Sequence, residues 1–147
     1  MPLDAVIADF MAGAVEYLTP KNDVDHWDHI EGKASLFHVS YSGVIMALVL
    51  GGQPDAPILG HEPTRAHMRG LPEYQQPSLE ELRDLALTLA QVGNPACEVL
   101  GISVNTQHMS DVEATAYLQQ VEASMGLPTV DPIRIGAGRL VDALVAL

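Results

Sequence analysis

The sequence predicts an α/β fold with a mainly parallel sheet flanked by helices in three layers. Short apolar segments that end in polar residues or glycine alternate with helix-like segments of about 10 to 15 residues, which is typical of a parallel sheet with helical crossovers. Hydrophobic residues make up 48% of the 147 residues, enough for one buried core. Charged residues are 18%, below the roughly 25% of an average soluble protein, so extensive disorder is not expected.

The first half of the chain contains two predicted helices with a predicted strand between them. Residues 6–18 carry apolar side chains at three- and four-residue spacing, with Asp4 as the expected N-cap and Pro20 just beyond the end. Residues 27–30 are interpreted as a strand that ends at an acid and a glycine. Residues 43–50 are apolar on every side and stop at a pair of glycines, which predicts a buried helix with a glycine C-cap.

The second half repeats this alternation. A strand predicted over residues 56–60 is followed by loop-like residues 64–77, where glycine and proline interrupt any regular pattern. Two helices begin at capping boxes, Ser78 to Glu81 and Ser110 to Glu113, in which the serine hydroxyl accepts a backbone N–H and the glutamate accepts the serine amide. The remaining predicted elements are a strand over 97–104, a short strand over 129–135 and a helix over 140–146.

The composition restricts the partners that we expect. The formal net charge is −12, and a surface of that kind repels nucleic acid and anionic membranes. The single cysteine, Cys97, lies in an apolar context, where we expect it in the core, and it cannot form an internal disulfide. The longest apolar run, residues 44–50, is much shorter than the roughly 20 residues of a spanning helix. With no signal-peptide pattern at the N-terminus, a cytoplasmic protein is expected.

Polar side chains follow three of the predicted strands. Glu31 follows the first, His61 and Glu62 the second, and Asn105 and Thr106 the third. Because right-handed crossovers bring the carboxyl ends of parallel strands to one edge, where such sheets bind ligands, these residues are predicted to meet in one crevice. The alternative is that they are polar only because loops meet water.

Each member of this group has a possible chemical role and a simpler structural one. Glu31 can act as a base or hold Mg²⁺, or it can be a solvated turn residue. His61 and Glu62 can form an acid–base pair, or His61 can be a hydrogen-bonded structural histidine.

Two further sets of residues are candidate substrate contacts. Arg65 and Arg69 lie close together in a chain with few basic residues, and their forked donors suit a carboxylate or a phosphate, although they could also simply neutralise an acidic surface. Ser35 and His38 could contact a substrate, but a nucleophilic pair would need a third orienting group that the sequence does not identify.

Several familiar motifs are absent from the sequence. His61-Glu62 is not followed by a histidine at the spacing of a zinc protease, and no glycine-lysine phosphate loop occurs in the chain. His26, Asp28 and His29 are close enough in sequence to suggest a metal, but neighbours on a strand point to opposite faces, which argues against a shared site.

Five segments in order resemble the C-terminal part of a bacterial family that was long of unknown function and was often labelled NAD-dependent epimerase/dehydratase. The family includes D-glutamate N-acetyltransferase, which acts before an N-acetylglutamate racemase in D-glutamate breakdown. The segments are Glu31-Gly32-Lys33-Ala34-Ser35-Leu36-Phe37-His38, His61-Glu62-Pro63-Thr64-Arg65, Gly70-Leu71-Pro72-Glu73-Tyr74, Ile102-Ser103-Val104-Asn105-Thr106 and Leu127-Pro128-Thr129-Val130-Asp131-Pro132-Ile133-Arg134.

The resemblance implies an architecture for the whole family member. It has a Rossmann-like domain followed by a P-loop-type domain, and residues 1–147 resemble the second half of the latter, as a single α/β domain. The phosphate loop for ATP is then expected upstream, outside this chain. The first segment departs from the family pattern Glu-Gly-Gln-Gly-Ser-Leu at Lys33 and Ala34, and Val39 replaces the proline that follows the histidine.

The resemblance also implies an activity, the transfer of an acetyl group from acetyl-CoA to the amine of D-glutamate. Such a reaction needs a base for the ammonium, donors for the developing oxyanion and cations for a small anionic substrate. The roles implied are a base at Glu31 or His61, binding of carboxylates or CoA phosphates by Arg65 and Arg69, and hydrogen-bond donation by Ser35 and Asn105.

Two other classes of function stay open. One is a nucleotide-dependent ligase or kinase related to the P-loop synthetases, with Glu31 on Mg²⁺; the missing phosphate loop counts against it for this chain. The other is a non-catalytic ligand-binding or assembly module. An uncovered sheet edge invites pairing with a second copy, so we expect at least a homodimer.

Overall fold

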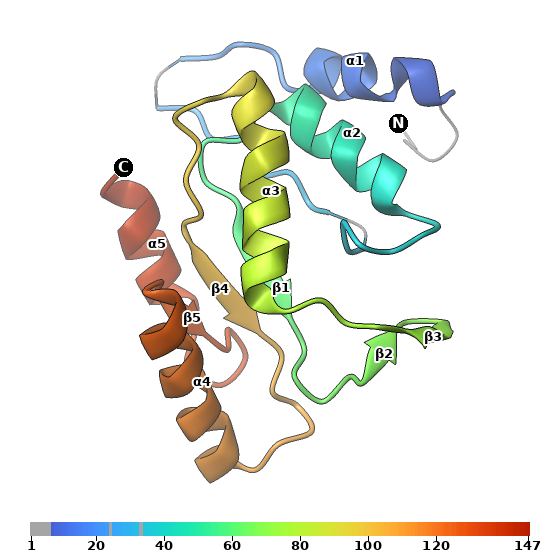
Figure 1. Cartoon of the computed structure of the whole chain (residues 1–147). Helices are drawn as coiled ribbons and strands as arrows, with labels where there is room; N and C mark the ends of the chain where they lie inside the picture. The colour runs from blue at the N-terminus through green and yellow to red at the C-terminus, as the bar shows by residue number, and fades with distance from the viewer. Residues whose placement is uncertain (1–6, 24, 33) are drawn as a thin grey trace. The chain divides into compact units, whose positions relative to one another are not determined.

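The computed structural model describes residues 7–23, 25–32 and 34–147. The chain divides into two compact units. Unit 1 comprises Met1–Asp55 and Asp84–Cys97, and unit 2 comprises Ala56–Arg83 and Glu98–Leu147. Figure 1 gives the order of the helices and strands along the chain. The expected N-cap Asp4 and the substituted position Lys33 lie outside the described residues.

Two helices that pack side by side form much of unit 1 (Figure 1). Helix α1 spans Ala8–Leu18 and helix α2 spans Ser42–Gly52, so both predicted helices are confirmed. The predicted burial of α2 is wrong, because only Ile45 and Gly51 of this helix are buried. They approach most closely at Gly51, where an added Cβ would collide with the carbonyl oxygen of Ala12 and the side chain of Val15.

The end of α2 differs from the prediction. The helix continues through both glycines and ends at Gln53, which takes the left-handed conformation with φ of 45°. The prediction of a glycine C-cap is therefore wrong. The physical reason is that Gly51 is needed inside the helix, where α1 leaves no space for a side chain.

The segment between α1 and α2 is irregular. Residues 27–30 form no strand, so the predicted strand is wrong. The side chain of Trp27 is 50% exposed and that of Ile30 is 38% exposed, whereas a strand of a covered parallel sheet buries both of its faces. The apolar character of this short segment therefore does not correspond to a central strand.

A parallel three-stranded sheet forms the centre of unit 2. Its strands are β1 (Ile58–His61), β4 (Gly101–Val104) and β5 (Thr129–Val130), in the order β1-β4-β5. Both pairings are parallel, which confirms the predicted α/β class with a parallel sheet and helices. The strands predicted over 97–104 and 129–135 are shorter than expected. Strand β4 begins only at Gly101, although Cys97, Val99 and Leu100 before it are already buried, and β5 ends at Val130. Cys97 is fully buried, as predicted, but it precedes β4 instead of starting it.

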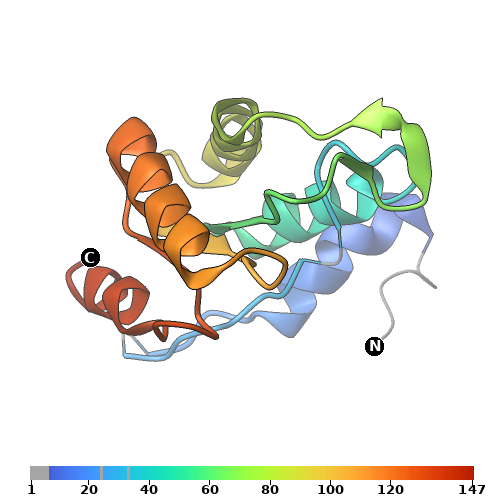
Figure 2. The same cartoon turned by 90° about the horizontal axis from the view of Figure 1, so that it is seen from below.

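Two helices pack against β5 in unit 2 (Figure 2). Helix α4 (Asp111–Met125) buries four apolar side chains at three- and four-residue spacing, and helix α5 (Gly138–Val145) buries Leu140. A Cβ at Gly101 of β4 would collide with Leu140 and with the carbonyl oxygen of Pro128. Glycine thus permits the close packing of α5 on the sheet. The buried residues of α4 are Ala114, Leu118, Val121 and Met125.

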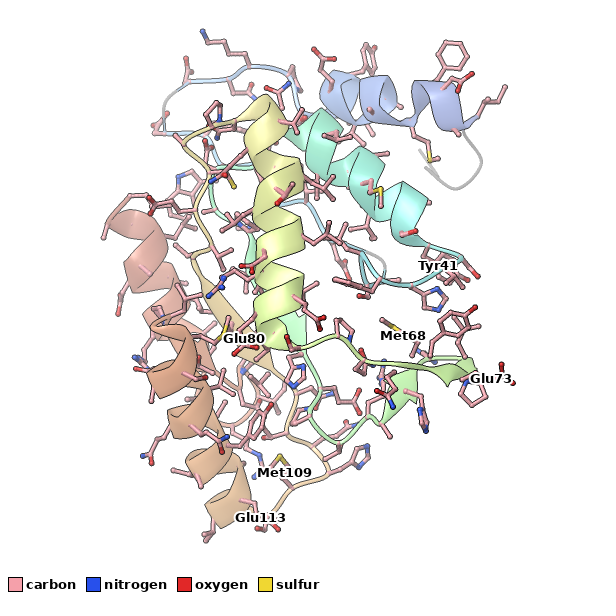
Figure 3. All side chains as sticks on the ribbon, in the orientation of Figure 1. Tyr41, Met68, Glu73, Glu80, Met109 and Glu113 are labelled. Carbon is pink, nitrogen blue, oxygen red and sulfur yellow. The ribbon has the colours of Figure 1, made fainter. Side chains whose placement is uncertain are left out.

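Both predicted capping boxes are present. At the start of α3 (Leu79–Gly93), the Ser78 amide donates to Glu81 at 2.8 Å, and the Glu81 amide donates to the Ser78 hydroxyl at 3.1 Å. At the start of α4, Ser110 and Glu113 make the same reciprocal pair, and Figure 3 shows Glu113 in the first turn. These local signals fix where both helices begin.

Residues 64–77 contain a small antiparallel hairpin that the sequence did not predict. Strand β2 spans His67–Met68 and strand β3 spans Leu71–Gln75, joined at Gly70 with φ of 77°. The prediction of a loop is wrong for these residues. The hairpin extends away from α4 and α5 in both views (Figures 1 and 2), and only Met68 of its strands is buried. Within the described residues, no helix is long and apolar enough to cross a membrane.

Candidate functional site

The ends of β1 and β4 bring two of the predicted polar segments together. His61 lies opposite Val104 in the parallel ladder, and the Asn105 amide donates to the His61 carbonyl oxygen at 2.8 Å. Residues that follow these two strands therefore leave the sheet at one edge. This confirms the predicted proximity of the His61-Glu62 and Asn105-Thr106 segments.

His61 is held by a tyrosine from helix α4. Its Nε2 lies 2.8 Å from the hydroxyl of Tyr117, and the two rings stack with centroids 6.0 Å apart and an interplanar angle of 19°. Burial lowers the pKa of His61, and the nearby carboxylate of Glu62 opposes that effect without cancelling it. A lowered pKa leaves the imidazole neutral near pH 7, the form that can accept a proton.

The second ring nitrogen of His61 is accessible. Among the described residues, every buried side-chain nitrogen and oxygen atom has a hydrogen-bond partner. Because the hydrogen bond of His61 runs through Nε2, its Nδ1 must reach solvent. A neutral histidine with one nitrogen fixed and the other exposed is suited to proton transfer.

Glu62 and Arg65 form an ion pair next to His61. The Arg65 guanidinium contacts the Glu62 carboxylate, and the Glu62 side chain is only 18% exposed. Glu62 is therefore already matched to a cation, and it acts on His61 through its charge. Arg69 is exposed at the turn of the hairpin, between β2 and β3.

Asn105 and Thr106 have different environments although they are adjacent. Asn105 is exposed, and its side-chain oxygen accepts the Gln107 amide at 3.1 Å, which shapes the turn after β4. Thr106 is fully buried, and both its amide and its hydroxyl donate to Asp131. Thr106 thus supports the turn, whereas the amide group of Asn105 faces solvent.

The loop after β4 is held by a buried carboxylate and an arginine. Asp131 also accepts the amides of Ile133 at 2.9 Å and Arg134 at 3.2 Å. Burial by itself raises the pKa of Asp131, but the hydrogen bonds from Thr106, Ile133 and Arg134 outweigh it and lower the pKa overall. The carboxylate is therefore charged at neutral pH.

Arg134 completes this cluster. Its guanidinium donates to the Thr106 hydroxyl at 2.8 Å and to the carbonyl oxygens of Thr106 and Met109 at 3.1 and 2.6 Å, and it also contacts the exposed carboxylate of Asp111. Figure 3 shows Met109 in the loop just before α4. These contacts occupy Arg134 with its own chain and fix the path from β4 into α4.

Glu31 lies in unit 1 and does not follow a strand. It is exposed and lines an open pocket of about 300 Å³. The prediction that Glu31 follows a strand at the sheet edge is wrong, because residues 27–30 form no strand. The pocket is lined by Val15, Leu18, Thr19, Asp28, His29, Ile30, Glu31 and Leu48.

Ser35 and His38 shape the turns that lead into α2. The Ser35 hydroxyl accepts the Phe37 amide at 3.1 Å, and Nδ1 of His38 accepts the Ser40 amide at 3.2 Å. His38 is 7% exposed and packs against Tyr41 at a ring distance of 4.9 Å. Their observed contacts are structural, and substrate contact by either residue stays a prediction.

A magnesium site at Glu31 finds no support in the arrangement of side chains. Within residues 7–23, 25–32 and 34–147, no three histidine, cysteine, aspartate or glutamate side chains are grouped closely enough to hold a metal ion. A lone carboxylate would leave most ligands to water or substrate. Magnesium at Glu31 stays a prediction.

Comparison with known proteins gives the family. Residues 1–141 match the family model described as "Domain of unknown function (DUF1611_C) P-loop domain". The chain belongs to this family. It corresponds to the C-terminal P-loop domain region of DUF1611 proteins, as the resemblance had implied.

Individual DUF1611 relatives agree with this assignment. A protein of Tritonibacter scottomollicae named "D-glutamate N-acetyltransferase" is 74% identical over all 147 residues, and the chain covers 44% of its length. A Pseudoalteromonas protein of the same name is 42% identical over 144 residues, 98% of this chain and 42% of the relative. A crystal structure of a DUF1611 protein from Anabaena variabilis has a TM-score of 0.87 and 35% identity, covering 99% of this chain and 43% of that one.

The chain therefore spans less than half the length of the DUF1611 relatives it matches. The family description refers to a P-loop, yet no glycine-lysine phosphate loop occurs in these 147 residues. The family description therefore suggests a phosphate-binding loop that these 147 residues do not contain.

Tyr117, Asp131 and Arg134 were not recognised as site residues from the DUF1611 sequence. Tyr117 lies in the middle of α4, where an aromatic residue at helical spacing is most often part of the core. Asp131 and Arg134 belong to one of the segments that carried the resemblance, and an acid three residues before an arginine was the available signal. Their partners are more than twenty positions away, so only the fold identifies the contacts.

Proposed function

We propose that this chain is the C-terminal part of an enzyme that transfers the acetyl group of acetyl-CoA to the amine of D-glutamate. The observation that carries the proposal is 74% identity, over the whole chain, to a protein named D-glutamate N-acetyltransferase. A second relative of that name, at 42% identity, supports the same activity. The site at the ends of β1 and β4 supplies chemistry that such a reaction requires.

His61 is the proposed base. The α-ammonium of D-glutamate must lose a proton before its nitrogen can attack the thioester carbonyl, and a neutral imidazole with an exposed Nδ1 can take that proton. The C–N bond then forms, the C–S bond breaks, and the leaving thiolate of CoA takes the second proton that the nitrogen loses as it becomes an amide. The charge of Glu62 beside His61 stabilises the imidazolium that results.

Three residues of this chain are proposed to bind the substrates: Arg65, Arg69 and Asn105. Arg65 is engaged with Glu62, so part of its charge is already compensated before a carboxylate or phosphate arrives. Arg69 is exposed on the hairpin and is proposed to contact the anionic substrate or CoA. Asn105 presents an exposed amide near His61 and is the proposed donor to the developing oxyanion. Ser35 and Glu31 are secondary candidates from unit 1.

The surface of unit 1 supports a requirement for further polypeptide. Helix α2 is apolar on every side, a pattern typical of a fully buried helix, yet only Ile45 and Gly51 are buried in it. Phe10 and Tyr17 of α1 are 67% and 83% exposed. Because the relatives are more than twice as long as this chain, we propose that acetyl transfer needs the additional part of such a protein.

A chimera tests the proposal directly. The matching 147 residues of the Tritonibacter enzyme are replaced by this chain, and release of CoA and formation of N-acetyl-D-glutamate are measured with acetyl-CoA and D-glutamate. We expect activity close to that of the unmodified relative, and a loss of about 100-fold or more in a His61→Gln chimera, because a general base contributes about 100- to 10,000-fold. L-Glutamate serves as the substrate control.

The outcomes separate the candidate functions. A folded chimera that lacks activity, beside an active parent, contradicts the proposal. Activity that depends on ATP and Mg²⁺, with no CoA released, would instead favour the ligase or kinase class that the P-loop description allows. Arg65→Ala in the same chimera should raise the KM for D-glutamate or acetyl-CoA; unchanged constants would remove Arg65 from substrate binding.

A further inference from the structure

The hydroxyl of Tyr117 determines which nitrogen of His61 can act. The hydroxyl lies 2.8 Å from Nε2, and the stacked rings resist rotation of the imidazole. Tyr117 is half-buried on α4, whose neighbouring residues Ala114, Leu118 and Val121 are packed in the core. The contact therefore joins a fixed helix to the end of β1, across 56 positions of sequence.

The carboxylate of Glu80 acts on Tyr117 through its charge. Burial raises the pKa of Tyr117, and the charge of Glu80 raises it further, so the phenol keeps its proton. Figure 3 shows Glu80 in the first turn of α3. A protonated phenol keeps oxygen lone pairs that can accept a hydrogen bond from the imidazole.

The charges around the pair agree with this direction. Glu62 lies beside His61 and is bound by Arg65, and Glu80 acts on Tyr117. The negative charges of Glu62 and Glu80 stabilise a protonated His61 imidazole. In that protonated form Nε2–H donates to the oxygen of Tyr117. Nδ1, which reaches solvent, is the nitrogen left to accept that proton.

We propose that Tyr117 is a positioning residue that accepts Nε2–H of His61 and so presents Nδ1 as the proton acceptor. Its catalytic consequence rests on the proposed acetyl transfer, but the hydrogen bond itself does not. Catalytic histidines are commonly oriented in this way, by a hydrogen bond from the ring nitrogen that does not take the proton.

Nuclear magnetic resonance of the chain, with ¹⁵N-labelled histidine, tests the hydrogen bond without any enzymatic assay. We expect neutral His61 to carry its proton on Nε2. In Tyr117→Phe the pKa of His61 should fall further, because the half-buried imidazolium loses its acceptor, and Glu80→Gln should shift it in the same direction by less. Tyr74→Phe and Glu73→Gln, two exposed positions of β3, are the matched controls and should change nothing.

Two results would overturn the proposal: a neutral His61 protonated on Nδ1, or the same His61 titration in Tyr117→Phe and wild type. If Tyr117→Phe fails to fold, the position of the proton on neutral His61 in the wild-type chain carries the test. In the chimera, Tyr117→Phe should lower kcat about tenfold with the KM for acetyl-CoA retained, and should move the acidic limb of the pH profile to lower pH. If Tyr117→Phe changes the His61 titration as predicted but leaves kcat unchanged, the hydrogen bond is supported and the role of His61 as the base is refuted.

Discussion

Replacing Asp131 with asparagine should unfold the β4–α4 connection. The carboxylate accepts four hydrogen bonds, two from Thr106 and one each from the amides of Ile133 and Arg134, and it is only 2% exposed. In Asp131→Asn one of the two oxygens becomes an NH₂ group, which points its hydrogens at two donors. The guanidinium of Arg134, 3.8 Å from the carboxylate, also loses its buried negative partner and keeps only the exposed carboxylate of Asp111.

The expected cost follows from these contacts. Hydrogen bonds to a charged group contribute about 1.5–3 kcal/mol each, and breaking a buried ionic contact costs about 3–5 kcal/mol. Because two hydrogen bonds are lost and the remaining contacts weaken, we expect about 3–5 kcal/mol of destabilisation. For a chain of this size that corresponds to a fall in Tm of roughly 6–20 °C.

Urea unfolding followed by circular dichroism measures the change, with protection of the Thr106 amide from hydrogen exchange as a local readout in unit 2. Asp111→Asn is the matched control, because Asp111 contacts the same arginine but its side chain is 94% exposed; it should cost less than about 1 kcal/mol. Equal effects of the two substitutions would refute the assignment of Asp131 as the buried anchor.

The effect also has a predictable pH dependence. The pKa of Asp131 is lower in the folded chain than the ordinary aspartate value, so its contribution is present above that ordinary value, about 3.9, and is lost as the pH falls through the folded pKa. The difference in stability between wild type and Asp131→Asn should therefore shrink on acidification below about pH 4. A difference that stays constant from pH 7 to pH 3 would show that the carboxylate charge is not responsible.

Three further predictions follow from the packing and the surface. Gly51→Ala should destabilise unit 1 by about 1–3 kcal/mol, because the added methyl group meets the Ala12 carbonyl and Val15. Gly43→Ala, which has open space around it in the same helix, is the control and should be neutral or stabilising by up to about 1 kcal/mol. Thermal unfolding of both variants measures the difference. Arg139→Gln should slightly lower the stability at low salt and lower it less at high salt, because its bidentate pair with Glu122, at 2.7 Å for both bonds, is solvent-exposed. An equal loss of stability at low and high salt would contradict this. The isolated chain should form at least a dimer through its uncovered apolar or sheet-edge surface, and a stable monomer in size-exclusion chromatography would contradict that expectation.

Local signals in the sequence were reliable where the physics is local. Ser78 and Ser110 begin helices because each capping box satisfies backbone amides within four residues, and both formed as predicted. The glycines of α2 were misread for the opposite reason. Their role depends on α1, more than thirty positions earlier, and the sequence pattern of a C-cap is the same as that of a close helix contact.

Strand prediction failed where apolar character was the main signal. Residues 27–30 and 101–104 are both short segments with two large apolar side chains, but only the second segment has parallel partners on both sides. Hydrogen bonding to neighbouring strands decides whether such a segment becomes a strand, because extended geometry alone gives a short segment little stability. The small β2–β3 hairpin, interrupted by Pro72 and an irregular register, carried too weak an alternation to be recognised.

The sequence by itself determined the α/β class, the starts of α3 and α4, the β1 and β4 segments, and the placement of His61-Glu62 and Asn105-Thr106 at the ends of neighbouring parallel strands. Tertiary structure alone decided the contacts of those residues: Nε2 of His61 meets the hydroxyl of Tyr117, and Thr106 is buried against Asp131 and Arg134. The physical reason is the range of the forces involved. Capping and periodicity act within a few residues, whereas a hydrogen bond between side chains 25 or 56 positions apart exists only after the sheet and helices have brought them together.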